Sequence, residues 1–295
     1  MNAKKWDKIA TITLYIISGI IVAILASLLL FILVRGLPHI SWHFLTAPSK
    51  AYEAGGGIGI QLFNSFYLLV ITMCISLPIA LGAGIYLSEY AKDNWVTNLI
   101  RTSIEILSSL PSVVVGLFGF LVFVIKADLG FSILSGALAL TFFNLPLLTR
   151  NVEESLQMIP FIQREAGLAL GLSRWETVTK VIIPEALPSI LTGIILSAGR
   201  IFGEAAALIY TSGQSAPKLD FTNWNPFDIQ SPLNIFRQAE TLAVHIWKIN
   251  SEGNLPDGVA VSAGASAVLI IAVLLFNFAA RYFGKKLYKK MTSAS

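Results

Sequence analysis

The chain has 295 residues, of which 55% are hydrophobic and only 13% carry a charge. Soluble domains average about 25% charged residues, so a soluble fold is excluded, and disorder is excluded for the same reason. The single cysteine, Cys74, lies inside an apolar run, which excludes a secreted disulfide scaffold. The net charge of +4 is better explained by lysines flanking a membrane than by nucleic-acid binding. This composition indicates an integral membrane protein.

Uncharged stretches predict six transmembrane helices. Crossing a bilayer takes about 20 mainly apolar residues, and six segments meet this length, although the fifth contains Arg200 and Glu204. The first segment is too long for a signal-peptide core and is followed by no A-x-A cleavage site, so we interpret it as a helix. The expected helices cover about 9–34, 62–88, 104–126, 131–150, 187–211 and 261–283.

The distribution of Lys and Arg predicts the orientation. With the N-terminus inside, inner segments hold 14 of these residues and outer segments hold 6, so the positive-inside rule places both termini in the cytoplasm. The two long connections then face opposite sides: an inner loop (residues 151–186) and an outer loop (residues 213–260). We divide the chain into an N-terminal helix with its outer loop (1–61), a transmembrane core (62–283) and a basic tail (284–295).

The inner loop carries local signals for two short helices separated by a turn. Gly171 is suited to the left-handed residue that often ends a helix. Ser173 and Glu176 form a capping-box pattern that begins a second helix, and Pro184 is expected to end it. Trp175 lies on one face of this second helix. From periodicity alone, an amphipathic helix that only anchors the loop at the membrane surface remains an equal alternative.

The same loop resembles the EAA loop of bacterial ABC importer permeases. Glu165, Ala166, Gly171 and Pro184 match in register, and Gly167 replaces the second alanine. In that family the loop is a coupling helix that docks into a groove of a cytoplasmic ATPase. The resemblance therefore implies an ATPase-coupling role for Glu165, Ala166, Gly167, Gly171, Ser173, Trp175 and Pro184.

Further segments resemble the permeases of phosphate importers. Residues 110–119, 143–154 and 199–207 carry this resemblance, and residues 232–236 with 245–247 look more like the PstA-type subunit than its PstC-type partner. The resemblance implies an all-α, MetI-like fold of a type I importer in a bacterial cell membrane. It also implies assembly with a homologous PstC-type permease, a dimer of ATP-binding subunits and an extracytoplasmic phosphate-binding protein.

Catalytic and cofactor motifs are missing from the sequence. It contains no G-x-x-x-x-G-K-[ST] nucleotide loop, so we expect ATP and Mg²⁺ to bind the partner ATPases and this chain to need no cofactor. His39 and His43 stand four apart without a third ligand nearby, which favours a surface role over a metal site. We therefore expect a non-catalytic subunit that moves phosphate and binds no nucleic acid.

Arg200 and Glu204 are the charges expected deepest in the membrane. Four residues apart, they would share one helix face, and a charge at the bilayer centre costs roughly 2.5–3.5 kcal/mol. Arginine suits phosphate because its planar fork donates two hydrogen bonds. We assign Arg200, Glu204, Ser112 and Asn144 to the substrate path, while an ion pair that only packs between helices is the alternative.

Three other functions are consistent with parts of the sequence. A permease for another oxyanion, such as sulfate or molybdate, would differ only in selectivity. A secondary transporter without an ATPase is disfavoured by the EAA-like loop. A membrane enzyme is disfavoured because no set of catalytic residues falls at membrane depth.

Overall fold

The computed structural model describes residues 3–50, 53–253 and 255–292, and these residues contain helices but no strand. Within these residues, five helices are long and apolar enough to cross a membrane, and a bent pair of helices gives a sixth when it is counted as one span. The prediction of an all-α protein with six spans is therefore confirmed. The five long helices are α1 (Ala3–Gly36), α3 (Gly59–Ile85), α6 (Ile133–Gln157), α9 (Ile183–Phe202) and α12 (Gly258–Thr292).

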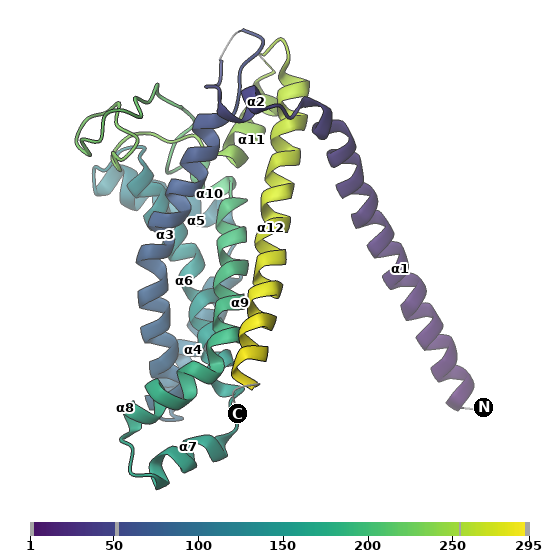
Figure 1. The fold of residues 1–295 in the computed structure, drawn as a ribbon, viewed down its shortest axis with the longest axis vertical. Helices are drawn as coiled ribbons and strands as arrows, with labels where there is room; N and C mark the ends of the chain where they lie inside the picture. The colour runs from purple at the N-terminus through teal and green to yellow at the C-terminus, as the bar shows by residue number, and fades with distance from the viewer. Residues whose placement is uncertain (1–2, 51–52, 254, 293–295) are drawn as a thin grey trace.

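Shorter helices lie at the two ends of the bundle (Figure 1). The lower end carries α7 (Phe161–Ala169) and α8 (Arg174–Thr177), and both chain ends lie there too. The upper end carries α2 (Trp42–Thr46) and α11 (Leu242–Glu252). The inner loop thus shares a side with both termini, as the charge distribution predicted, and we call the two ends inner and outer.

The third span is bent, so the prediction of one helix over 104–126 is wrong. It consists of α4 (Trp95–Ser108), α5 (Ser112–Gly119) and the π-helical η3 (Phe120–Lys126), with a bend of 98°. Pro111 has the extended angles φ −61° and ψ 137°. Proline lacks an N–H and disfavours helical geometry in the residue before it, so the helix stops even though the surrounding residues are uncharged.

The fifth span differs from its prediction at both ends. A continuous helical segment runs from Arg174 to Phe202, so Pro184 does not end the second inner helix. The π-helical η4 (Val178–Ile182) precedes α9. Pro184 lies in the first turn of α9, where the N–H that proline lacks has no partner within the helix, so its loss costs little. At the other end α9 stops at Phe202, and α10 (Ala206–Ile209) is separate.

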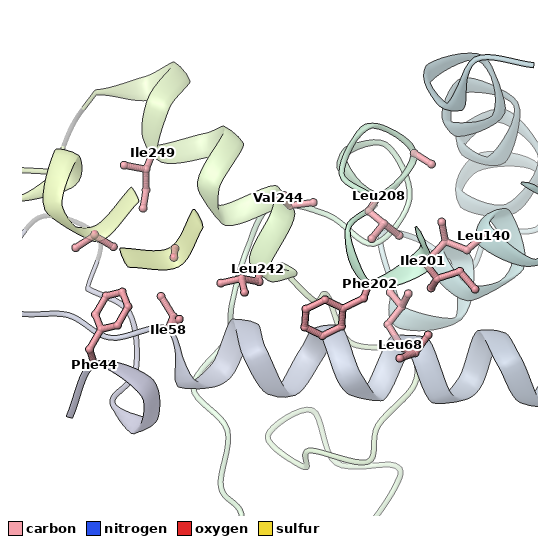
Figure 2. Close-up of a cluster of buried hydrophobic side chains, with 14 residues drawn as sticks. Phe44, Ile58, Leu68, Leu140, Ile201, Phe202, Leu208, Leu242, Val244 and Ile249 are labelled. Carbon is pink, nitrogen blue, oxygen red and sulfur yellow. The ribbon is translucent and has the colours of Figure 1, made fainter. Parts of the chain in front are cut away.

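Small residues and two apolar clusters hold the bundle together. Gly84 on α3 faces Val152 on α6, and Gly136 on α6 faces Leu68 on α3; such residues let helix backbones approach closely. Figure 2 shows the larger cluster, in which Phe202 of α9 lies near Leu68. The second cluster joins α6, η4 and α9 at the inner end, and its buried members are Val152, Leu156, Ile159, Ile182, Ala186 and Ile190.

The first helix stands apart from the other spans. Figure 1 shows α1 leaving the outer end of α12 obliquely, and no residue of its most apolar stretch is buried. At its C-terminal end, Gly36 lies against Ala263 and Ala267 of α12. Most of the large apolar side chains of α1 are exposed. At the other terminus α12 continues through 284–292, so most of the expected tail is helical.

Candidate functional site

Arg200 lies at mid-depth in the bundle. The preceding residue, Gly199, faces Phe276, which is roughly 27 Å along α12 from its first residue at 1.5 Å per residue. The Arg200 guanidinium carbon lies 4.2 Å from the centroid of the Phe143 ring on α6. A cation over a ring face is attracted by the ring quadrupole. Arg200 remains exposed and, among the described residues, forms no salt bridge.

Asn144 lies next to Phe143 and joins α6 to α9. Its Oδ1 accepts a hydrogen bond of 3.0 Å from the Ser197 hydroxyl, three residues before Arg200. Its Nδ2 is buried and has no hydrogen-bond partner among the residues described. Arg200, Asn144 and Ser197 thus bring a fixed cation and polar groups to one α6–α9 contact, and Ser197 was not predicted.

Glu204 and Ser112 do not join this contact through any hydrogen bond or ion pair between described residues. The expectation that Arg200 and Glu204 share one helix face is wrong, because α9 ends at Phe202 and Glu204 lies beyond it. Glu204 Oε1 instead accepts from the backbone N–H of Ala207 at 3.3 Å, at the start of α10. Ser112 is the half-buried first residue of α5, directly after the bend.

Gly171 ends α7 as the sequence predicted. Its φ is +81°, a left-handed conformation that only glycine adopts at little cost. The Gly171 N–H donates to the Leu168 carbonyl at 3.0 Å, and the Leu172 N–H donates to the Gly167 carbonyl at 3.2 Å. These two bonds are the Schellman pattern, which turns the chain sharply from α7 to α8.

The second inner helix begins with the predicted capping box. The Ser173 hydroxyl accepts from the Glu176 N–H, and the Glu176 carboxylate accepts from the Ser173 N–H at 3.0 Å. Trp175 is 58% exposed just after this cap, and Glu165 and Ala166 on α7 are also exposed. The surface is enlarged by four more exposed apolar side chains, those of Phe161, Ile162, Leu168 and Leu170.

Gly167 is the point of closest contact between the two inner helices. A Cβ on Gly167 would lie 2.7 Å from Cγ2 of Thr177 on α8, closer than two carbons can approach without displacement. Glycine at the position of the family's second alanine therefore permits this α7–α8 packing.

A buried ion pair fixes α7 to the inner end of α3, and the sequence analysis missed it. The Glu89 carboxylate, in the π-helical η2 (Tyr86–Tyr90), accepts from Arg164 Nε at 3.1 Å and from Nη2 at 2.7 Å. Glu89 directly follows the uncharged stretch 54–88, so the sequence could have predicted that it lies at the end of a span. The sequence could not have predicted its partner, Arg164, which lies 75 residues further along the chain.

A second polar cluster lies at the outer end, beneath the outer loop. The Glu240 carboxylate accepts from Gln61 Nε2 at 2.9 Å, and its Oε1 lies 3.2 Å from His245 Nδ1. Arg237 Nη2 donates to Asn64 Oδ1 at 2.9 Å. Burial lowers the pKa of Arg237 to about 10, with Tyr67 acting in the opposite direction, so Arg237 stays charged at neutral pH.

This outer cluster borders a cavity of about 220 Å³ that Glu240, His245 and Lys248 help to line. His245 Nε2 is buried without a hydrogen-bond partner in the described part of the chain. Within residues 3–50, 53–253 and 255–292, no group of three His, Cys, Asp or Glu residues could hold a metal ion. The hydrogen bonds of Glu240 to Gln61 and of Arg237 to Asn64 join the outer loop to α3.

Comparison with solved structures supports the fold. The chain aligns with the alginate ABC transporter crystallised with its pentasaccharide-bound periplasmic protein, at a TM-score of 0.63 and 12% identity, over 97% of this chain and 96% of that one. It also aligns with an inward-facing MetNI methionine ABC transporter at a TM-score of 0.56 and 19% identity, covering 78% and 94%. At these identities the likeness shows the MetI-type fold alone.

Sequence relatives agree with this fold. A probable ABC transporter permease protein, YqgI of Bacillus subtilis, is 54% identical over 99% of this chain and 100% of its own length. The phosphate transport system permease protein PstA of Xylella fastidiosa is 36% identical over 60% of this chain and 62% of its own length. The PstA of Yersinia pestis is 38% identical, over 57% and 56%.

The family model for the binding-protein-dependent transport system inner membrane component matches residues 76–293. That match covers the bent third span, the fifth span, the inner loop and the outer loop. The chain therefore belongs to this family of multi-pass ABC importer permeases of the bacterial inner membrane.

Proposed function

We propose that this chain is a permease subunit that moves inorganic phosphate into the bacterial cytoplasm. The observation that carries the proposal is Arg200, an exposed cation at mid-depth with no carboxylate partner among the described residues. A charge at this depth is expensive, so its retention is explained by an anion that passes it. The PstA relatives favour phosphate as that anion.

The chemistry of the site suits a tetrahedral oxyanion. The Arg200 fork can donate two hydrogen bonds to phosphate oxygens, and Asn144 Nδ2 is an unused donor on the neighbouring helix. Phe143 supports the guanidinium from one side without neutralising its charge, so the attraction for an anion in a low-dielectric surround is kept. Glu204 and Ser112 lie next to the two helix breaks, and we assign them to the same path.

The inner loop is the surface that we propose for the ATPase. Its exposed apolar side chains, including Trp175 and Leu170, would be costly to leave in water. Glu165 and Ala166 on the same loop are exposed as well. In this proposal the partner ATPases bind ATP and Mg²⁺, and their closure moves α7 and α8. The chain itself breaks no bond.

Two further partners follow from exposed surfaces. The most apolar stretch of α1 is unburied, which suits packing against a second, homologous permease of the PstC type. In the outer loop Trp224, Phe227 and Phe236 are exposed, and exposed aromatic side chains are common at protein contacts. We propose that this loop meets an extracytoplasmic phosphate-binding protein. Charged substitutions at Trp224 and Phe236 should then lower the ATP hydrolysis that the binding protein stimulates.

Transport in proteoliposomes tests the substrate. The assembled complex and its binding protein should take up labelled phosphate only when ATP is supplied on the side of the membrane where the ATPases lie. A hundredfold excess of unlabelled phosphate should suppress this uptake of label. Equal inhibition by excess sulfate or molybdate would instead identify a permease for another oxyanion. Uptake without ATP would identify an ATPase-independent transporter.

A further inference from the structure

The inner end of α3 is tied to the inner loop through Glu89. This side chain is 6% exposed, and its two carboxylate oxygens accept from Arg164 Nε and Nη2 at 3.1 and 2.7 Å. The Ser88 hydroxyl donates to the same carboxylate at 3.0 Å. A two-point contact of this kind fixes the plane of the guanidinium as well as its distance.

Arg164 extends this contact to a third element. It belongs to α7, and its side chain is 17% exposed. Its Nη1 donates to the Ile159 carbonyl at 2.6 Å and its Nη2 to the Leu156 carbonyl at 2.8 Å. Leu156 lies in the last turn of α6, and Ile159 lies two residues beyond its end. One guanidinium therefore links α3, α6 and α7.

Arg174 adds α8 to the same junction. Its Nη2 donates to the Glu89 backbone carbonyl, and its guanidinium carbon lies 4.9 Å from the centroid of the Tyr90 ring. Glu89 thus contacts both inner helices, one through its side chain and one through its main chain. The exposed face of these helices, which carries Trp175, takes no part in the junction.

We infer that Glu89 is a positioning residue for energy coupling, because it holds α7 and α8 in a fixed orientation at the inner end of α3. The inference rests on the proposed function, in which the inner loop receives the motion of the ATPase. Without the carboxylate, Arg164 keeps only backbone carbonyls as partners, and a buried cation without its counter-charge is strongly disfavoured. The loop would then move without pulling α3.

The chain offers a matched control for this junction. Glu153 on α6 is also buried at the inner end, with 9% side-chain exposure, and it pairs with Arg101 Nε at 2.8 Å. This pair links α4 to α6, and Arg101 Nη2 also donates to the Leu87 carbonyl in η2 at 3.2 Å. Among the described residues, neither Glu153 nor Arg101 forms a hydrogen bond or ion pair with α7 or α8. Glu89→Gln and Glu153→Gln make the same chemical change in comparable surroundings.

The first measurement compares phosphate uptake with ATP hydrolysis in proteoliposomes holding the complete complex. Glu89→Gln should assemble and hydrolyse ATP but move at least about fivefold less phosphate per ATP, the lower end of usual couplings between sites. Arg164→Lys, which keeps the charge and loses the fork, should fall between wild type and Glu89→Gln. Glu153→Gln should keep the wild-type ratio. Equal ratios in the two Gln variants would overturn the inference.

The second measurement needs no phosphate, so it tests Glu89 whatever the cargo is. Spin labels at Val70 on α3 and Ala169 on α7, in a Cys74→Ser background, report the distance between these helices in the assembled complex. Glu89→Gln should broaden the distance distribution, and Glu153→Gln should leave it narrow. An unchanged distribution in Glu89→Gln overturns the inference, while a wild-type complex that moves no phosphate counts against the proposed function alone.

Discussion

Replacing Gly171 with valine should uncouple the inner loop from the ATPase. The residue has φ +81°, and a β-branched side chain in this left-handed region costs about 1–3 kcal/mol. A cost of about 2 kcal/mol shifts the equilibrium away from the turn roughly thirtyfold. No atom lies within 4 Å of a Cβ built at this position. The penalty therefore comes from the backbone itself, and repacking of neighbours cannot relieve it.

The expected defect is confined to the direction of α8. Loss of the Gly171 and Leu172 hydrogen bonds to α7 would move Trp175 away from its present orientation, while the spans keep their contacts. We expect Gly171→Val to insert normally and to lose most ATPase association and binding-protein-stimulated hydrolysis. Gly171→Asn should be milder, because asparagine tolerates the left-handed conformation. Co-purification with the ATP-binding subunit and a hydrolysis assay measure both effects.

Gly253 provides the matched control. It ends α11 with φ +63° and also has no atom near its Cβ, so Gly253→Val introduces similar strain at the outer end. If both valine variants lose hydrolysis equally, the loss reflects general instability. If Gly171→Val hydrolyses ATP like the wild type, the left-handed stop has no role in coupling.

Three further outcomes are expected. Gly167→Ala should weaken ATPase association because its Cβ would meet Thr177, and adding Thr177→Ala should restore binding in the same co-purification assay. Arg200→Gln should lower phosphate uptake at least about tenfold, the equivalent of one lost charged hydrogen bond, with Arg200→Lys in between; full uptake by Arg200→Gln would contradict a role in the path. Glu240→Gln should lower the free energy of unfolding by about 1–3 kcal/mol, seen as earlier thermal denaturation in detergent without loss of selectivity.

Local signals in the sequence were sufficient for the turn in the inner loop. Gly171, Ser173 and Glu176 act on backbone groups within four residues of themselves, so their spacing predicts their contacts. The number of spans was predictable because it depends on hydropathy over about 20 residues. In both cases the determining interactions lie within a short window of the chain.

Features that depend on where a helix stops were predicted less well. Pro111 lies inside an uncharged stretch, and a count of charges does not register the break it causes. The expectation that Arg200 and Glu204 share one helix face required an unbroken helix past Phe202, and α9 ends at that residue. The contact of Arg200 with Phe143 and that of Glu89 with Arg164 join distant segments, which spacing along the chain cannot reveal.

The π-helical turn η4, which connects α8 to α9, sets the direction in which the inner loop faces. A π turn accommodates one extra residue within about the rotation of one α-helical turn. If the same five residues wound as ordinary α-helix, everything on the N-terminal side would rotate by about 100° relative to α9, the angle between successive residues at 3.6 per turn. Arg174 would then face away from Glu89 and Tyr90 although no contacting residue had changed. Deleting one residue together with the π turn would instead keep the present orientation of α8.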